Sequence, residues 1–217
     1  MNSKTLAGAF ITFEGIDGSG KTTQLRLIAE DLRFRGLPVL TTQEPGGTPL
    51  GRKLRQTFLE TDEAVDPLAE LLLFAADRAQ HVNFLIKPAL AAGKIVVSDR
   101  YADATYAYQG AGRGFSQETI NQITALATGG LKPDLTLFYD LPVAAALSRT
   151  AQRNAGGEQK NRMDEEKADF YERVRAAYRE LAAQDAARFR IIDAARSIEE
   201  IHRESLTVVT DFLRLSV

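Results

Sequence analysis

The stretch EGIDGSGKTT, residues 14–23, constrains the fold more than any other part of the sequence. From Gly15 to Thr22 it follows the pattern G-x-x-x-x-G-K-S/T of a phosphate-binding loop. The apolar run Ala9–Phe13 precedes it, and the helical pattern Thr22–Arg35 follows it. In such a strand–loop–helix unit, backbone N–H groups and the helix N-terminus point at phosphate oxygens. The motif therefore predicts an α/β unit that binds a polyphosphate.

Four further apolar runs, separated by helical patterns, extend this unit. They are Pro38–Thr42, Lys94–Ser98, Asp134–Tyr139 and Phe189–Ile192. Alternation of strands and helices favours βαβ units, so we expect a five-stranded parallel sheet flanked by helices. A chain of 217 residues is long enough to bury one substantial core. We therefore expect a single domain over residues 1–217.

Local signals place several helix ends. Gly36 can adopt the left-handed conformation that ends the first helix. Ser197 and Glu200 have the spacing of a capping box and open a last helix that runs toward Phe212. Residues 110–114, GAGRG, have the composition of a flexible loop, and residues 153–162 interrupt two helical patterns.

A long helix is predicted from about Pro67 to Ala92, with Pro88 as a possible kink before Gly93 closes it. Its apolar side is expected to face the core. That side comprises Leu68, Leu71, Leu72, Ala75, Ala79, Val82 and Ile86.

Composition excludes several classes of protein. A formal net charge of −2 argues against a surface built for nucleic acid. The absence of cysteine excludes disulfides, thiolate metal sites and cysteine nucleophiles. The apolar run in MNSKTLAGAFITF is too short for a signal peptide or a membrane span. We therefore expect a cytoplasmic protein that works without nucleic-acid or membrane partners.

The phosphate loop also indicates a metal site. Lys21 can reach the β and γ phosphates, and the Thr22 hydroxyl can ligate Mg²⁺. The apolar run Ile95–Ser98 leads into Asp99, as in a Walker B aspartate. Because ligands gather at the carboxyl ends of parallel strands, Asp99 is expected to face the same crevice as Lys21.

Three arginines suggest an anionic acceptor. Arg55, Arg78 and Arg100 each stand near the predicted crevice, and guanidinium forks suit the task of bringing two phosphates together. Phe74 and Arg78 share one helix face at i, i+4 spacing. That pair is either a core phenylalanine beside a surface arginine or a platform that stacks on a base and hydrogen-bonds its edge.

The motifs EGIDGSGKTT, EPGGT, LLLFAADRAQ, SDRY and AYQGAGRG, in this order, closely resemble those of the bacterial thymidylate kinases. The resemblance extends over nearly the whole chain and includes KPDLTLFYDLP and the late IIDA. It implies the nucleoside monophosphate kinase fold, transfer of the ATP γ-phosphoryl group to dTMP to give dTDP, a requirement for Mg²⁺, and a homodimer.

The resemblance also assigns roles to residues. Phe74 would stack on thymine, Arg78 would donate toward a ring oxygen, and Arg55 and Arg100 would clamp the acceptor phosphate. Asp17 would lie near the deoxyribose 3′-hydroxyl. The implied catalytic residues are Lys21, Arg100, Arg153 and Asp17. The implied dTMP-binding residues are Asp17, Glu44, Pro45, Arg55, Phe74, Arg78, Arg100, Thr105, Tyr108 and Gln109. The implied ATP-binding residues are Gly15, Asp17, Gly18, Ser19, Gly20, Lys21, Thr22, Thr23 and Arg149, with Thr22 and Asp99 on the metal.

A mobile lid over ATP is implied at about residues 149–163. Its stretch from Arg149 to Arg162 carries four basic residues against one acidic residue, a net charge of +3. Family members with an arginine at the place of Gly18 use it on the phosphates, so a lid arginine is expected to replace it here. Arg153 is the first candidate, Arg149 is expected against adenine, and Arg162 is a further candidate. Gln43 departs from the arginine common at this place in bacterial members.

Other functions remain open at this stage. A deoxynucleoside kinase would use Glu44 as general base toward a hydroxyl acceptor. Three arginines on one acceptor site exceed what an uncharged nucleoside needs. A GTP-binding switch would carry N-K-x-D, which is absent from the chain, and a nucleic-acid module would have only the arginines of residues 149–162.

Overall fold

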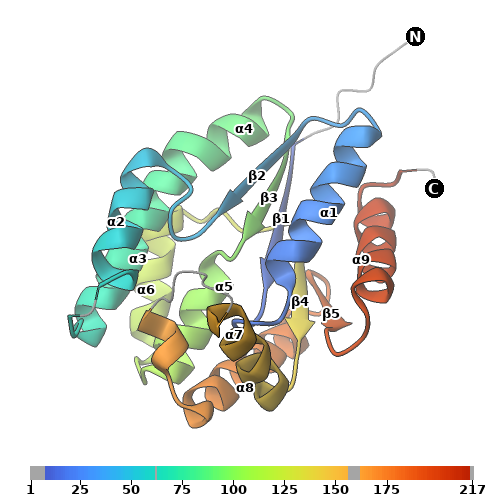
Figure 1. The fold of residues 1–217 in the computed structure, drawn as a ribbon. Coiled ribbons are helices and arrows are strands. Elements are labelled where there is room, and N and C mark those ends of the chain that lie inside the picture. The colour runs from blue at the N-terminus through green and yellow to red at the C-terminus, as the bar shows by residue number, and fades with distance from the viewer. Residues whose placement is uncertain (1–7, 62, 156–161, 216–217) are drawn as a thin grey trace.

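The computed structural model describes residues 8–61, 63–155 and 162–215, and its centre is a parallel five-stranded sheet (Figure 1). The strand order is β2-β3-β1-β4-β5. The strands are β1 (Ala9–Glu14), β2 (Val39–Gln43), β3 (Ile95–Asp99), β4 (Leu135–Asp140) and β5 (Phe189–Asp193). All five predicted strands are confirmed, each within one residue at either end.

Strand register brings three functional segments to one edge of the sheet. Phe13 on β1 and Gln43 on β2 both pair with Asp99 on β3. The chain therefore leaves β1, β2 and β3 at the same level, and the loops that follow them lie side by side. All six residues of β1 are buried, which explains why this strand reads as a continuous apolar run.

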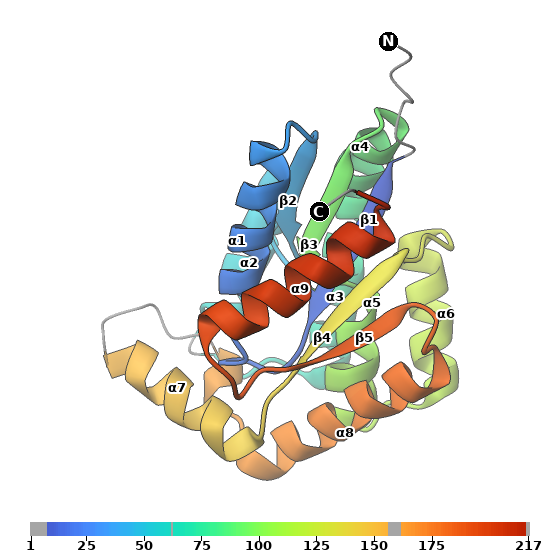
Figure 2. The ribbon, with the colours of Figure 1, turned by 90° about the vertical axis from the view of Figure 1, so that its right-hand side faces the viewer.

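Helices cover both faces of the sheet (Figures 1 and 2). On one side α1 packs against α9, and Figure 2 shows α9 in front of β1 and alongside β4. The predicted stop at Gly36 (φ 77°) and the capping box of Ser197 and Glu200 are both confirmed. The helices are α1 (Lys21–Phe34), α2 (Pro49–Leu59), α3 (Pro67–His81), α4 (Lys87–Ala91), α5 (Ala102–Thr105), α6 (Gln117–Thr128), α7 (Val143–Ala155), α8 (Ala168–Gln184) and α9 (Ile198–Phe212).

The predicted long helix is interrupted by a π-helical turn, Val82–Ile86, between α3 and α4. Its widened hydrogen bonding joins the Lys87 N–H to the Val82 carbonyl. Pro88 then stands in the first turn of α4, where its missing N–H costs little. The predicted kink at Pro88 is therefore replaced by a widened turn just before it.

The predicted core face of this helix is wrong in part. Leu71, Val82 and Ile86 are buried, but Leu68 and Leu72 are 48% and 51% exposed. Ala75 and Ala79 are half-buried. Polar side chains occupy the inner face of α3 in their place, because they line the site described below or bind residues that line it. They are Glu70, Asp77, Arg78 and His81.

The prediction of a flexible loop at residues 110–114 is also wrong in part. Gly110 and Gly112 belong to a second π-helical segment, Tyr106–Gly112, that continues α5. A Cβ on Gly112 would lie 2.6 Å from a ring carbon of Phe170 on α8. The glycine is thus needed for close packing between this segment and α8, and only Arg113 and Gly114 turn away from the helix.

Within the described ranges, every helix is too short or too polar to span a membrane. The structure describes part of the predicted lid. Residues 149–155 form the end of α7, and Arg162–Glu165 form a 3-10 turn. Residues 156–161 lie outside the described residues.

Candidate functional site

The phosphate loop connects β1 to α1 and depends on glycine at two close approaches. At Gly15 (φ 144°) a Cβ would lie 2.7 Å from the Tyr139 carbonyl oxygen, and at Gly18 (φ 79°) it would lie 2.5 Å from the Ala146 carbonyl oxygen. L-residues with side chains rarely adopt these backbone angles. The loop is therefore held tightly between β4 and α7.

Lys21, Thr22 and Asp99 meet at the mouth of the loop. The Thr22 hydroxyl donates to Asp99 Oδ2, and Lys21 Nζ lies 4.0 Å from Asp99 Oδ1. That Oδ1 is buried and has no hydrogen-bond partner. Burial and the nearby Arg100 lower the pKa of the Lys21 amine below its ordinary value. A buried carboxylate oxygen without a partner, beside a hydroxyl, is the hard oxygen set that Mg²⁺ prefers.

Arg100 has a left-handed backbone (φ 68°), which is unusual for a residue with a side chain. Two contacts hold it. The Arg100 N–H donates to the Phe13 carbonyl, and the next N–H, of Tyr101, donates to Glu14 Oε1 at 2.7 Å. The turn after β3 is thus pinned to β1, and it directs the Arg100 side chain back over the phosphate loop.

The Arg100 side chain forms a triad with Asp17 and Tyr108. Arg100 Nη2 lies 3.0 Å from Asp17 Oδ1 and 2.8 Å from the Tyr108 hydroxyl, which donates to Asp17 Oδ2 at 3.2 Å. Burial by itself would raise the pKa of Asp17, but the charges of Arg100 and Lys21 hold it well below its ordinary range. The carboxylate in the loop therefore stays ionised and orients the arginine.

A second network joins the end of β2 to the inner face of α3. Arg78 donates from Nε to Glu44 Oε2 at 2.7 Å and from Nη1 to Thr105 at 2.6 Å. His81 Nδ1 lies 2.8 Å from Glu44 Oε1, and its Nε2 lies 2.6 Å from the Thr42 hydroxyl. Sequence reasoning missed His81, although its i, i+3 spacing from Arg78 could have indicated it.

All ten predicted dTMP-binding residues line one cavity between the phosphate loop, α2, α3, α5 and the second π-helical segment. Phe74 is half-buried there and packs edge-on against Phe58, with ring centroids 4.9 Å apart. Arg78 is only 2% exposed, which contradicts the reading of it as a surface arginine. The cavity also includes Leu59, Ala104 and Met163, which the sequence did not indicate.

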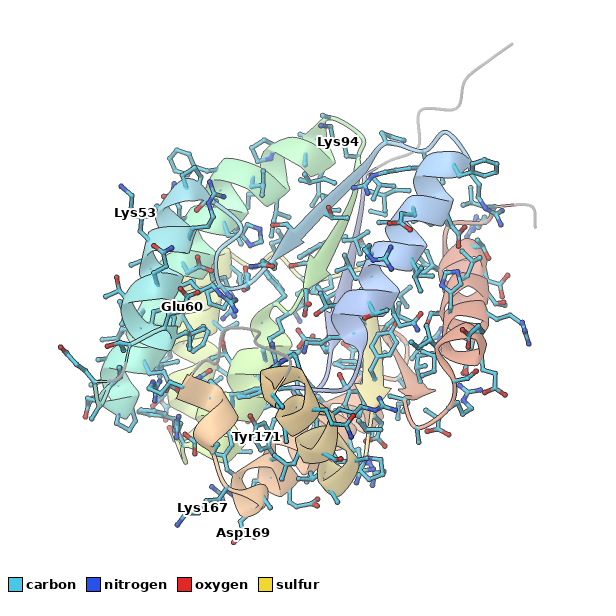
Figure 3. The ribbon with its side chains drawn as sticks, in the orientation of Figure 1. Lys53, Glu60, Lys94, Lys167, Asp169 and Tyr171 are labelled. Carbon is cyan, nitrogen blue, oxygen red and sulfur yellow. The ribbon has the colours of Figure 1, made fainter. Side chains whose placement is uncertain are left out.

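Met163 reaches this cavity from the segment between α7 and α8. The Tyr171 hydroxyl donates to the Met163 carbonyl at 2.8 Å and fixes the segment. Figure 3 shows Lys167 and Asp169 projecting outward below Tyr171, and both are exposed, whereas Met163 is buried.

A second cavity lies over the phosphate loop and adjoins the first. It contains most of the predicted ATP-binding and metal residues, and Gln43 on its rim. Gly15 and Ser19 are absent from its lining, and Ser19 is buried. Four residues line both cavities and form their common wall: Asp17, Glu44, Arg55 and Arg100.

The arginines of the predicted lid lie in two places. Arg149 and Arg153 line the cavity over the phosphate loop, and Arg149 Nη1 donates to the Ala194 carbonyl after β5. Arg162 instead contacts Glu70 on α3 and donates to the Phe58 carbonyl. Arg162 is therefore engaged on the acceptor side of the molecule, away from the lining of the nucleotide cavity.

Comparison with known proteins agrees with this geometry. The family model described as thymidylate kinase matches residues 13–205. The thymidylate kinase of Desulfovibrio desulfuricans is 46% identical over 209 residues, which cover 94% of this chain and 96% of that protein. That of Syntrophus aciditrophicus is 49% identical and covers 90% of this chain and 91% of its own length. The crystal structure of thymidylate kinase from Ehrlichia chaffeensis superposes with a TM-score of 0.77 at 36% identity, covering 94% of this chain and 99% of that one. The chain therefore belongs to the thymidylate kinase family.

Proposed function

As a member of this family the chain is an ATP-dependent kinase that converts dTMP to dTDP, and we propose that transfer occurs at the wall shared by its two cavities. One observation carries this proposal. Asp17, Arg55 and Arg100 line both the cavity over the phosphate loop and the cavity that contains Phe74. A donor phosphate in the first cavity and an acceptor phosphate in the second would meet at these side chains.

The reaction forms a bond between a dTMP phosphate oxygen and the γ-phosphorus and breaks the bond from that phosphorus to the β-γ bridging oxygen, releasing ADP. A phosphate monoester oxygen is already a nucleophile, so no general base is needed. Catalysis then consists of alignment and charge neutralisation. We assign the charge on the donor side to Lys21 and Arg153, which line the cavity over the phosphate loop. Arg55 and Arg100 act between the two phosphates, with Asp17 holding Arg100 in place.

A magnesium ion fits the residues present. Thr22 Oγ1 and Asp99 Oδ1, which accepts no hydrogen bond, would hold it. The described residues contain no cluster of three or more His, Cys, Asp or Glu side chains that would form a closed protein cage. This agrees with an ion that shares its ligands with ATP phosphates and water. When bound, Mg²⁺ would neutralise charge on the β and γ phosphates.

Glu44 is poorly suited to act as the base of a nucleoside kinase. Arg78 and His81 occupy its two carboxylate oxygens. Burial alone would raise the pKa of Glu44, but the charge of Arg78 and the hydrogen bond from His81 lower it below its ordinary value. We assign Glu44 the role of orienting Arg78 toward the base, with Phe74 stacking on it and Thr105, Tyr108 and Gln109 completing the pocket.

The acceptor can be tested directly. ADP production is measured with dTMP or thymidine as sole acceptor, and we expect turnover with dTMP alone. Turnover with thymidine and none with dTMP would reject the assignment. Arg55→Met should lower kcat/KM for dTMP at least tenfold, because a desolvated charge-assisted hydrogen bond is lost. Arg52→Met is the matched control, since Arg52 is exposed on the same helix.

We further propose a homodimer through the outer face of α3. Leu68, Leu72 and Ala76 follow one another at i, i+4 spacing and are all exposed. Such an apolar stripe on a helix favours burial against another surface. Sedimentation of Leu72→Lys should give a monomer, while Phe34→Lys, at a site 94% exposed on α1, should leave the assembly unchanged. A native chain that sediments as a monomer would reject the dimer.

A further inference from the structure

Glu70 is a buried carboxylate to which the mechanism above gives no role. It stands in the first turn of α3 and is 0% exposed. Gln109 Nε2 donates to its Oε1 at 2.9 Å. Gln109 is itself 2% exposed and lines the acceptor cavity. Glu70 thus lies directly behind a residue that is expected to contact the base.

Two arginines keep this carboxylate charged. Arg113 donates to Glu70 from Nε at 3.2 Å and from Nη2 at 3.1 Å, and Arg162 Nη2 contacts the same Oε2. Burial raises the pKa of Glu70, but the hydrogen bonds from Arg113, Arg162 and Gln109 lower it below its ordinary value. At neutral pH the group is therefore a carboxylate with acceptor atoms only.

A carboxylate leaves the Gln109 amide one favourable orientation. The NH₂ group must face Glu70, because a carbonyl oxygen there would meet a second acceptor. The Gln109 carbonyl oxygen is then the atom that remains for the cavity. Arg78 lines the same cavity with a guanidinium that can only donate. The Gln109 oxygen can accept from the N3–H of thymine while Arg78 donates to its O4. Cytosine has an acceptor at N3 and a donor at N4, so it would place like groups against both side chains.

We infer that Glu70 is a positioning residue for base selection: by holding the Gln109 amide in one orientation, it makes the acceptor pocket choose a 4-oxo, N3–H pyrimidine. This inference rests on the proposed function, in which dTMP occupies the cavity lined by Gln109 and Arg78. A purely structural Glu70 would instead affect all acceptors equally.

The test compares two acceptors that carry the same 5-methyl group, dTMP and 5-methyl-dCMP. They differ only by the exchange of donor and acceptor at ring positions 3 and 4. The kcat/KM for each is measured by ADP release with the native chain, Glu70→Gln, Gln109→Leu and the double variant. Glu70→Gln replaces the acceptor by an amide that tolerates either orientation of Gln109. We expect its dTMP preference to fall at least tenfold, with the KM for ATP unchanged.

A double-mutant comparison isolates the path through Gln109. If Glu70 acts through this amide, Glu70→Gln will have little further effect on the preference once Gln109→Leu is present. Glu166→Gln is the matched control, because Glu166 pairs with Arg113 at 2.6 Å. It should retain the native preference.

Three results separate the possible failures. No turnover of dTMP by the native chain would reject the proposed function itself. Equal losses for both acceptors in Glu70→Gln would overturn the positioning role while leaving that function intact. An effect of Glu70→Gln that is as large in the Gln109→Leu background would overturn it as well. If Glu70→Gln does not fold, Glu70→Asp is used, since its shorter side chain keeps a charge for the arginines but withdraws it from Gln109. An unchanged preference for dTMP over 5-methyl-dCMP in Glu70→Asp would equally count against the inference.

Discussion

Replacing Glu14 by glutamine should remove a pH dependence of stability that is built into the centre of the fold. Glu14 is fully buried, accepts from the Tyr101 N–H at 2.7 Å and from the Tyr178 hydroxyl at 2.7 Å. Burial, with a further contribution from the negative charge of Asp103, raises its pKa from 4.5 to about 8, although Tyr178, Arg100 and the Tyr101 N–H favour the charged form.

The sign follows from where the proton is bound. Between pH 4.5 and 8 the folded chain holds the Glu14 proton and the unfolded chain has lost it. The stabilisation is complete below pH 4.5 and disappears as the pH rises through 8. Each pKa unit corresponds to about 1.4 kcal/mol, so this group should lower the free energy of unfolding by on the order of 4 kcal/mol from pH 5 to pH 9.

Urea unfolding at unit pH steps from 5 to 9 measures this effect. In Glu14→Gln the amide oxygen can still accept from Tyr101, and its NH₂ can donate to the Tyr178 oxygen, but nothing titrates. The variant is expected to lose less stability than the native chain over this range, by about 4 kcal/mol. Glu172→Gln, an exposed change on α8, should behave like the native chain. Parallel curves for the native chain and Glu14→Gln would refute the reasoning.

The remaining predictions concern the lid, the loop and one tight contact. Arg153→Ala should lower kcat at least 100-fold with little change in the KM for dTMP, because its charge would act on the transferring phosphoryl group; unchanged turnover would assign that charge elsewhere. Asp17→Ala should lower kcat/KM for dTMP about tenfold or more while calorimetric ATP affinity is kept, and a collapse of ATP affinity would place Asp17 on the donor side. Gly112→Ala should cost about 1–3 kcal/mol in urea unfolding through its clash with Phe170. Gly110→Ala, whose nearest neighbour lies 3.7 Å away, is the control and should cost less.

Elements that follow simple burial rules were predictable from sequence. The five strands are apolar runs because the sheet is covered on both faces. The ends of α1 and α9 depend on Gly36 and on the Ser197–Glu200 pair, which act within their own segments. Signals of this kind need no knowledge of the rest of the fold.

The inner face of α3 was not predictable in the same way. A periodic pattern assumes that apolar residues point inward, yet this helix turns Glu70, Asp77 and His81 inward and leaves Leu72 outside. Buried polar groups are tolerated there largely because they find partners on distant segments. Gly46, for example, donates its N–H to Asp77 Oδ1 at 3.1 Å, while Asp77 Oδ2 is buried without a hydrogen bond. A single sequence does not reveal which distant residues will provide those partners.

The site likewise divides into residues that a local motif predicts and residues that depend on distant contacts. Gly15, Lys21 and Thr22 belong to one local motif, and the family resemblance supplied the acceptor residues, whose roles stay predictions. Met163 and Glu70 were missed, because Met163 lines the cavity and Glu70 contacts Gln109 only through the packing of remote segments.

The close approach of α7 to the phosphate loop explains why position 18 and the lid depend on one another. A Cβ at Gly18 would lie 2.5 Å from the Ala146 carbonyl oxygen and 3.0 Å from the Thr150 hydroxyl, so no side chain fits between loop and helix. Ala146, Arg149 and Arg153 are spaced i, i+3 and i+7 and therefore share the helix face that meets the loop. The approach that excludes a side chain at Gly18 is the same one that brings both arginines to the lining of the nucleotide cavity. The close approach of α7 thus leaves no room for an arginine at position 18 and also brings Arg149 and Arg153 to the nucleotide cavity. In this chain the arginine charge beside the phosphates is therefore expected from α7 rather than from the loop.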